Sequence, residues 1–154
     1  MRRVGWVAMG LILVVLLVGC APVVTIQNNT QIPVRAFLSS GGRSEVLSPS
    51  PGESSSAEVT EGPYRVTVVP DLEWIDYAKA TRSYLNERLA DSDNLTGQQL
   101  LDVIRRLKDI AQRIQQFENA AGTGSGCRGA VSSEGGGLVA VSTAADGSLV
   151  VSCQ

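Results

Sequence analysis

The chain contains no histidine among its 154 residues. This removes the commonest protein ligand for transition metals and the commonest general base near neutral pH. The motifs G-x-S-x-G, S-x-x-K and H-E-x-x-H are absent too, and the acidic residues do not follow the spacing of a calcium loop. We therefore expect no metal and no other cofactor, and the sequence argues against an enzyme without excluding one.

The chain also lacks an excess of basic residues. It has 13 lysines and arginines against 15 acidic residues, and two of the basic residues, Arg2 and Arg3, stand at its start. Beyond them the balance is 11 to 15, a formal charge of −4. Binding to a nucleic-acid backbone needs a basic surface, so we expect no nucleic-acid partner.

No apolar run is long enough to cross a membrane comfortably. The longest covers residues 4–18, interrupted only by Gly5 and Gly10, whereas a spanning helix needs about 20 residues. A positive start, a short apolar run and small residues at its end are typical of an export signal.

The end of this segment, Leu17-Val18-Gly19-Cys20, resembles the lipobox of bacterial lipoproteins. The resemblance implies that residues 1–19 are a signal peptide, and that Cys20 becomes the mature N-terminus and is acylated, palmitate included. Several acyl chains together hold a protein stably at a membrane. Ala21 in the next position resembles lipoproteins sent to the outer membrane of two-membrane bacteria. An uncleaved anchor with an unmodified Cys20 is the alternative.

Residues 20–22 form a short tether, and residues 23–154 are expected to form one extracytoplasmic domain. Apolar and polar residues alternate through residues 23–70, between turns rich in glycine, proline and asparagine, which indicates short, half-buried strands. The Pro51-Gly52 turn, followed by the strand that begins Gly62-Pro-Tyr-Arg-Val, resembles small bacterial surface sandwiches of the PEGA or carboxypeptidase-regulatory-like kind. That resemblance implies a spacer or adhesive unit.

Two helices are expected to follow as a hairpin, over residues 71–90 and 97–118. Asp71 is placed to cap the first helix, and Thr96 with Gln99 forms a capping box for the second. The second helix carries an apolar stripe that Leu101, Ile104 and Ala111 are expected to widen. Its main positions are Leu100, Val103, Leu107, Ile110, Ile114 and Phe117. Packing against the first helix and the sheet is the favoured role of the stripe, and a dimer seam or another partner-binding face is the alternative.

The C-terminal region predicts a β-hairpin, with strands over residues 137–143 and 148–153 joined at Asp146-Gly147. Residues 122–126 are expected to be a linker, and residues 130–133 a further short strand. Cys127 and Cys153 remain as an even pair, which in an oxidising compartment indicates a disulfide bond. In a tight three-stranded meander these cysteines would lie far apart, so we expect Cys127 in a loop near the open end of the hairpin.

Three groups of residues are candidates for a site. Trp74, Arg105 and Arg106 are candidates for binding a partner, and Arg105 and Arg106, with Lys108 and Arg113, form a basic helix side that either touches lipid headgroups or is simply solvated. Asp71, Glu73 and Asp76 beside Trp74 allow a glycosidase-like carboxylate pair or an ordinary helix start. Gly124, Gly126 and Gly129 match G-x-G-x-x-G in spacing only, and a flexible connector is the favoured interpretation.

Together these patterns predict an α+β fold: a small antiparallel β-sheet or sandwich with an inserted helical hairpin and a C-terminal β-hairpin that joins the first sheet. The predicted protein is a membrane-anchored lipoprotein outside the cytoplasm, in the outer membrane if the host has two, with a non-catalytic binding or envelope-assembly role and an envelope protein as candidate partner. The alternatives are a small hydrolase that uses the carboxylates near Trp74 and a solute-binding lipoprotein. The oligomeric state stays open.

Overall fold

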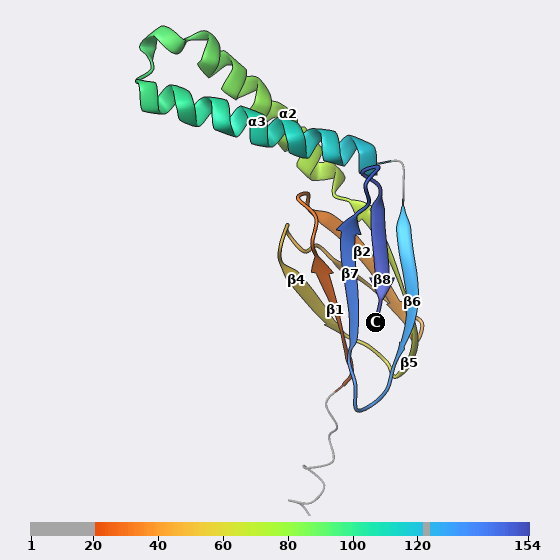
Figure 1. Cartoon of the computed structure of the whole chain (residues 1–154). Coiled ribbons are helices and arrows are strands. Elements are labelled where there is room, and N and C mark those ends of the chain that lie inside the picture. Colours follow the sequence, from red (N-terminus) through yellow and green to blue (C-terminus); the bar gives the residue numbers. More distant parts are fainter. Residues whose placement is uncertain (1–20, 122–123) are drawn as a thin grey trace, which may run out of the picture.

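The computed structural model describes residues 21–121 and 124–154, so the predicted signal peptide and Cys20 lie outside the described residues. The described chain forms a β-sandwich that carries a helical hairpin at one end (Figure 1). The elements in order are β1 (Val23–Asn28), β2 (Val34–Ser40), β3 (Arg43–Leu47), β4 (Ser54–Glu58), β5 (Gly62–Pro70), α2 (Leu72–Ala90), a 3-10 turn (Ser92–Asn94), α3 (Gly97–Ala120), β6 (Ser125–Val131), β7 (Gly137–Thr143) and β8 (Leu149–Cys153).

The strands divide into two sheets of four. Sheet A has the order β4-β1-β7-β8, and sheet B has the order β3-β2-β5-β6. All neighbours are antiparallel except β1 and β7, which run parallel, with Val24 opposite Gly137 and Asn28 opposite Val141. The C-terminal hairpin thus joins the first β-region, and the two helices form an excursion between the paired strands β5 and β6, as predicted.

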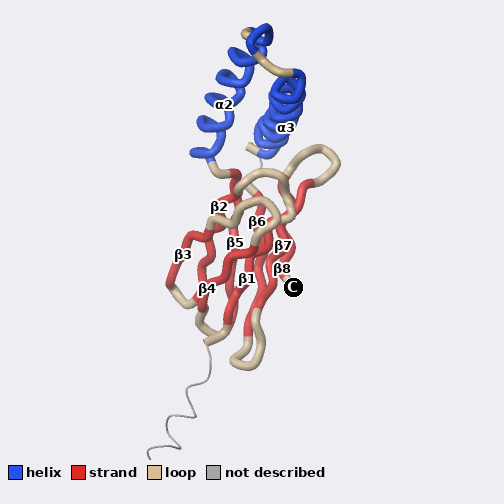
Figure 2. Tube along the Cα trace, turned by 90° about the vertical axis from the view of Figure 1, so that its left-hand side faces the viewer, coloured by secondary structure: helices blue, strands red, loops and turns tan. Residues whose placement is uncertain are grey.

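The alternation of the strands places the core between the sheets. The fully buried apolar side chains from both sheets are Val24, Ile26, Val34, Ala36, Val66, Val68, Val139 and Val141. Successive strand residues point to opposite faces, and β1, β2, β5 and β7 send every second side chain into this core. Figure 2 shows the strands running along the length of the sandwich and the helices standing beyond one end.

Both helix starts follow the sequence signals. The Asp71 side chain accepts a hydrogen bond from the Glu73 backbone, and Thr96 with Gln99 completes the capping box at α3. The stripe of α3 packs within the hairpin, where Val103, Ile110 and Phe117 are buried. The expected widening of the stripe is wrong for two large residues, since Leu101 is 65% exposed and Ile104 is 47% exposed. A single partner helix covers only a narrow strip of α3, and these residues lie outside it.

The connector predicted after the helices is wrong, because residues from Ser125 onward form strand β6. Two of its glycines, Gly126 and Gly129, pair with Thr67 and Tyr64 of β5. A side chain at Gly129 would come within 2.5 Å of the buried Tyr64 ring. These glycines therefore reflect close packing inside a strand and not a flexible linker.

The cysteine pair forms a disulfide bond, but the expected setting of Cys127 in a loop is wrong. Cys127 lies in β6 of sheet B and Cys153 lies at the end of β8 in sheet A, with their Cα atoms 5.7 Å apart. The meander that would have separated them does not form, because β6 belongs to one sheet and the β7–β8 hairpin to the other. The bond therefore joins the two sheets along one side of the sandwich.

Candidate functional site

The acidic cluster predicted from the sequence lies where the hairpin meets the sandwich. Arg35 of β2 holds two of its members: Arg35 Nε is 3.1 Å from Asp71 Oδ1, and Arg35 Nη2 is 2.9 Å from Glu73 Oε1. The hydrogen bond to Glu73, followed by the charge of Asp71, raises the pKa of the Arg35 guanidinium above its ordinary value. Asp76 is exposed on α2. Asp71 and Glu73 thus fasten the start of α2 to sheet B.

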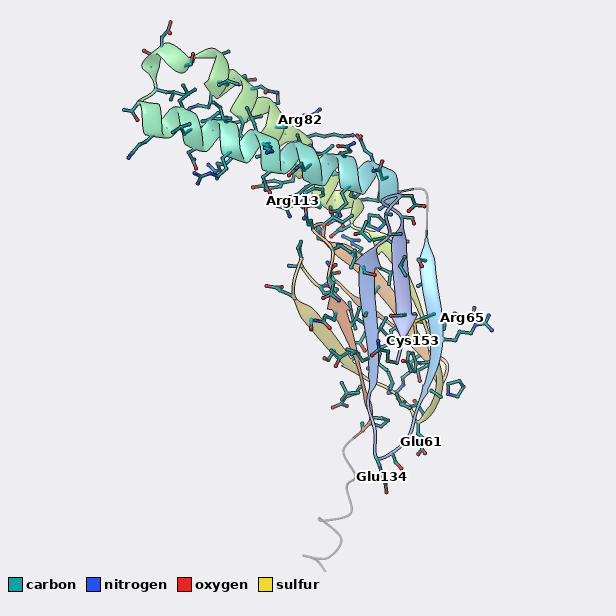
Figure 3. The ribbon with its side chains drawn as sticks, viewed as in Figure 1. Glu61, Arg65, Arg82, Arg113, Glu134 and Cys153 are labelled. Carbon is teal, nitrogen blue, oxygen red and sulfur yellow. A yellow bond between two sulfur atoms is a disulfide. The ribbon has the colours of Figure 1, made fainter. Side chains whose placement is uncertain are left out.

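Trp74 lies in the same region, and its ring is half-buried between neighbours. The Arg113 guanidinium carbon is 5.0 Å from the ring centroid, and the Phe117 ring centroid is 5.9 Å away. Arg113 Nε also donates a hydrogen bond of 2.9 Å to the Gln31 carbonyl oxygen of the sandwich. The indole therefore links α2, α3 and the loop before β2, and its contacts are structural ones (Arg113 is labelled in Figure 3).

This arrangement does not favour the hydrolase interpretation. Glycoside hydrolysis needs one carboxyl group free to give a proton and a second free to attack or to activate water. Here Asp71 caps a helix and pairs with Arg35, and Glu73 shares the same arginine. Asp71 and Glu73 are thus engaged in structural contacts, while Asp76 stands exposed outside them.

The other two predicted partner-binding residues lie towards the far half of the hairpin. Arg106 is 3.8 Å from Asp102 one turn earlier, and Arg105 is exposed. A shallow groove of about 280 Å³ runs between the helices beside Arg106. Its lining includes Tyr84, Leu85, Arg88, Gln99, Asp102 and Val103. The structure thus separates Arg106 from Trp74, which lies at the root of the hairpin.

Two exposed tyrosines on α2 are not among the site residues predicted from the sequence. Tyr77 is 69% exposed and Tyr84 is 56% exposed. Residues seven apart lie on nearly the same face of a helix, so their spacing was a signal that these rings share one side. With the exposed Leu101 and Ile104 of α3, they give the hairpin more apolar surface than its internal packing requires.

The hairpin stands at the end of the sandwich opposite to the one where β1 begins (Figure 1). The exposed basic side of α3, which includes Arg105 and Lys108, is therefore remote from Ala21 and Pro22.

Two general findings concern the described residues. Residues 21–121 and 124–154 contain no cluster of three or more histidine, cysteine, aspartate or glutamate side chains that fits a metal ion. Across the same ranges, none of the helices has the length and apolarity to traverse a lipid bilayer.

The fold and these surfaces define an α+β protein in which a disulfide-bonded β-sandwich carries a two-helix hairpin. Comparison of the chain with protein-family models, curated protein sequences and solved structures gives no match.

Proposed function

We propose that this chain is a lipid-anchored module outside the cytoplasm that binds an envelope protein through its helical hairpin and catalyses no reaction. The observation that carries the proposal is the hairpin itself, which projects from the sandwich at the end remote from Ala21. Five large hydrophobic side chains on it are exposed: Leu72, Tyr77, Tyr84, Leu101 and Ile104. Exposed apolar groups that gather in one patch mark protein-binding surfaces, and Tyr77 and Tyr84 lie seven residues apart on one side of α2.

The dimensions of the parts support a role at a distance from the membrane. A helix of 24 residues, the length of α3, extends about 36 Å. The tether of two or three residues after Cys20 reaches only about 10 Å. An acylated Cys20 would thus keep the sandwich against the bilayer while the hairpin points outward.

The hairpin is also fixed in direction, which a presenting element requires. Besides the contacts of Arg35 and Arg113, Gln116 Nε2 donates a hydrogen bond of 3.2 Å to Thr143 Oγ1 at the end of β7. The sandwich thus holds both helices at their root. Preorganisation of this kind lowers the entropy lost on binding.

The anchor is tested by mass spectrometry of the mature N-terminus and by detergent phase partitioning. The wild-type chain is expected to begin at a diacylated or triacylated Cys20 and to enter the detergent phase. The Cys20→Ala chain is expected to retain its signal peptide and to carry no lipid. An unmodified Cys20 in the wild-type chain would refute the lipoprotein assignment.

The binding surface is tested by crosslinked pull-down from native membranes, with an affinity handle after the exposed Gln154. A double variant, Tyr77→Ala with Tyr84→Ala, is expected to lose most of the recovered partner. The matched control is Lys79→Ala with Asn86→Ala, which changes two exposed positions on another side of α2. Equal recovery by both double variants would exclude the tyrosine side of the hairpin.

A further inference from the structure

The outer face of sheet B carries several arginine side chains. Three arginines stand on it, Arg35, Arg65 and Arg128, and none of the side chains that the strand alternation directs to this face is acidic. The other members are Phe37, Ser39, Ser44, Val46, Pro63, Thr67, Val69, Gly126 and Ala130. Arg35 is paired with Asp71 and Glu73, so the uncompensated positive charge of this face comes from Arg65 and Arg128.

Two of these arginines face each other. Arg65 of β5 is directly opposite Arg128 of β6, and both are exposed. Directly opposed side chains have their Cβ atoms about 5 Å apart, and like charges in such positions destabilise a sheet. Among the described residues, the ion pairs involve other arginines: Arg35, Arg106 and Arg113. Within the described part of the chain, Arg65 and Arg128 thus have no ion-pair partner.

A hollow lies beside this arginine pair. It measures about 330 Å³ and is bordered by Arg65, Thr67, Gly126 and Arg128. Gly126 is opposite Thr67 and contributes no side chain, so the backbone is accessible there. A Cβ atom at Gly126 would come within 2.6 Å of the Val66 carbonyl oxygen. A larger residue at this position could therefore not be accommodated without a shift of the backbone.

The disulfide bond holds the arginine pair in place. Cys127 precedes Arg128 and is tied to Cys153 in sheet A, and Val66, opposite Cys127, is fully buried in the core. The backbone beneath Arg65 and Arg128 is therefore fixed on both strands. Figure 3 shows the Arg65 side chain extending away from the sandwich, with Glu61 and Glu134 at the end of the molecule apart from it.

An exposed apolar pair adjoins the hollow. Phe37 of β2 is opposite both Val46 of β3 and Thr67 of β5, and the Phe37 and Val46 side chains are exposed. The row that continues to Gly126 thus carries apolar side chains at one end and the hollow at the other. The neighbouring row ends in Arg65 and Arg128.

We propose that this face binds an acidic segment of a partner protein, with its carboxylates on Arg65 and Arg128 and an apolar side chain on Phe37 and Val46. A guanidinium fork matches a carboxylate geometrically, and the complementary charge would relieve the repulsion between the two arginines. The open, shallow face fits a protein segment better than a lipid, because an acyl chain binds in a deep apolar cavity. This inference does not rest on the lipid anchor or on the hairpin surface.

The test uses the full chain in detergent micelles and fluorescence anisotropy. The probe is a capped, fluorescent peptide in which glutamates alternate with serines and one position is phenylalanine, and its control peptide has glutamine for every glutamate. Arg65→Gln and Arg128→Gln are each expected to weaken binding of the acidic peptide about tenfold, since each removes one charge-assisted contact. The charge-matched control is Arg82→Gln on α2, which is expected to bind like the wild type.

Thermal unfolding separates a site from a structural role. Because the two arginines repel each other, neither Arg65→Gln nor Arg128→Gln is expected to lower Tm, so loss of peptide binding would not reflect unfolding. Equal binding by all three variants, or equal binding of the glutamine peptide, would overturn the proposal.

Two competitors and one hydrodynamic measurement identify other occupants. Inorganic phosphate that displaces the peptide as effectively as a free glutamate peptide would indicate a small-anion site. Vesicles of equal parts phosphatidylglycerol and phosphatidylethanolamine that compete through Arg65 and Arg128 would indicate lipid headgroups. A dimer in sedimentation that Arg128→Gln dissociates would place a second copy on this face. Each of these results would refute a partner-protein segment as the occupant.

Discussion

Tyr64 lies in the interior of the sandwich against Gly129 and Gly137. Its ring limits the size of the side chain that these two positions can carry. Tyr64 is 3% exposed. A Cβ atom at Gly129 would come within 2.5 Å of its ring, and one at Gly137 would come within 2.8 Å of its hydroxyl oxygen. A buried ring cannot move aside cheaply in a closely packed interior.

Gly129→Ala should therefore destabilise the protein by about 1–3 kcal/mol, the usual range for overpacking. The measurement is urea unfolding followed by circular dichroism. Gly97→Ala is the matched control, because Gly97 begins α3 with nothing within 4 Å of an added Cβ. That control should stabilise the protein by about 0.4–1 kcal/mol. A neutral Gly129→Ala would mean that the Tyr64 ring is not fixed against β6.

The same tyrosine should make the protein sensitive to alkali. Burial raises the pKa of the Tyr64 hydroxyl above its ordinary value of 10.0. In the unfolded chain this hydroxyl loses its proton near that value, while the folded protein still retains it. The free energy of unfolding should therefore fall as pH rises from the unfolded pKa through the folded one.

Tyr64→Phe removes this titration. The difference in free energy of unfolding, variant minus wild type, should therefore increase between about pH 8 and about pH 11, because only the wild type loses stability through Tyr64. The two proteins differ at position 64 alone, so the comparison isolates the contribution of Tyr64. A difference between the two proteins that does not change with pH would show that Tyr64 does not titrate differently on folding.

At the scale of elements, α3 shows how far a hydrophobic stripe can be predicted. The spacing of Val103, Ile110 and Phe117 identified the buried face correctly. The sequence does not state how many neighbours the helix has, and with one partner helix Leu101 and Ile104 are left exposed.

The strand β6 was predicted poorly for a different reason. Its glycines predicted a flexible linker. In the structure, the Tyr64 ring fills the space that a side chain at Gly129 would take.

Alanine substitutions on α3 distinguish these two faces. Ile110→Ala should lower the free energy of unfolding by about 2–4 kcal/mol, because a 7% exposed side chain leaves a cavity. Leu101→Ala should change it by no more than about 0.5 kcal/mol, since the side chain is in water. Both values come from urea unfolding of the helical signal. Similar losses for both variants would place Leu101 in a packed interface after all, such as one between two copies.

At the scale of the whole molecule, the assignment of each strand to one of the two sheets was the least predictable feature. Alternation tells which side of a strand is buried, but not to which of two sheets the strand belongs. The prediction of a disulfide bond was correct because it followed from cysteine number, whereas the loop expected for Cys127 assumed a wrong partition of strands. The acidic cluster was found in the sequence, but its partner Arg35 comes from a distant strand.

The disulfide bond should contribute to stability mainly by closing a loop between positions 26 apart in the sequence. Cys153→Ser should lower the free energy of unfolding by about 3–4 kcal/mol in the loop-entropy model. Chemical denaturation of the wild type with and without a reductant provides the comparison. If reduction and Cys153→Ser both leave the denaturation midpoint unchanged, the bond does not hold the two sheets together.

The placement of the hairpin between paired strands leads to a last prediction. Val68 of β5 is opposite Ser125 of β6, so the two strands are already neighbours where the helices leave and return. A chain in which residues 71–123 are replaced by a short Asn-Gly turn therefore keeps every strand of both sheets. It should fold with a β-type circular dichroism spectrum and an intact disulfide bond, but with a lower Tm, because the buried Phe117 and Ala120 at the root are lost. An unfolded product would mean that the hairpin is part of the folding unit and not an element presented by the sandwich.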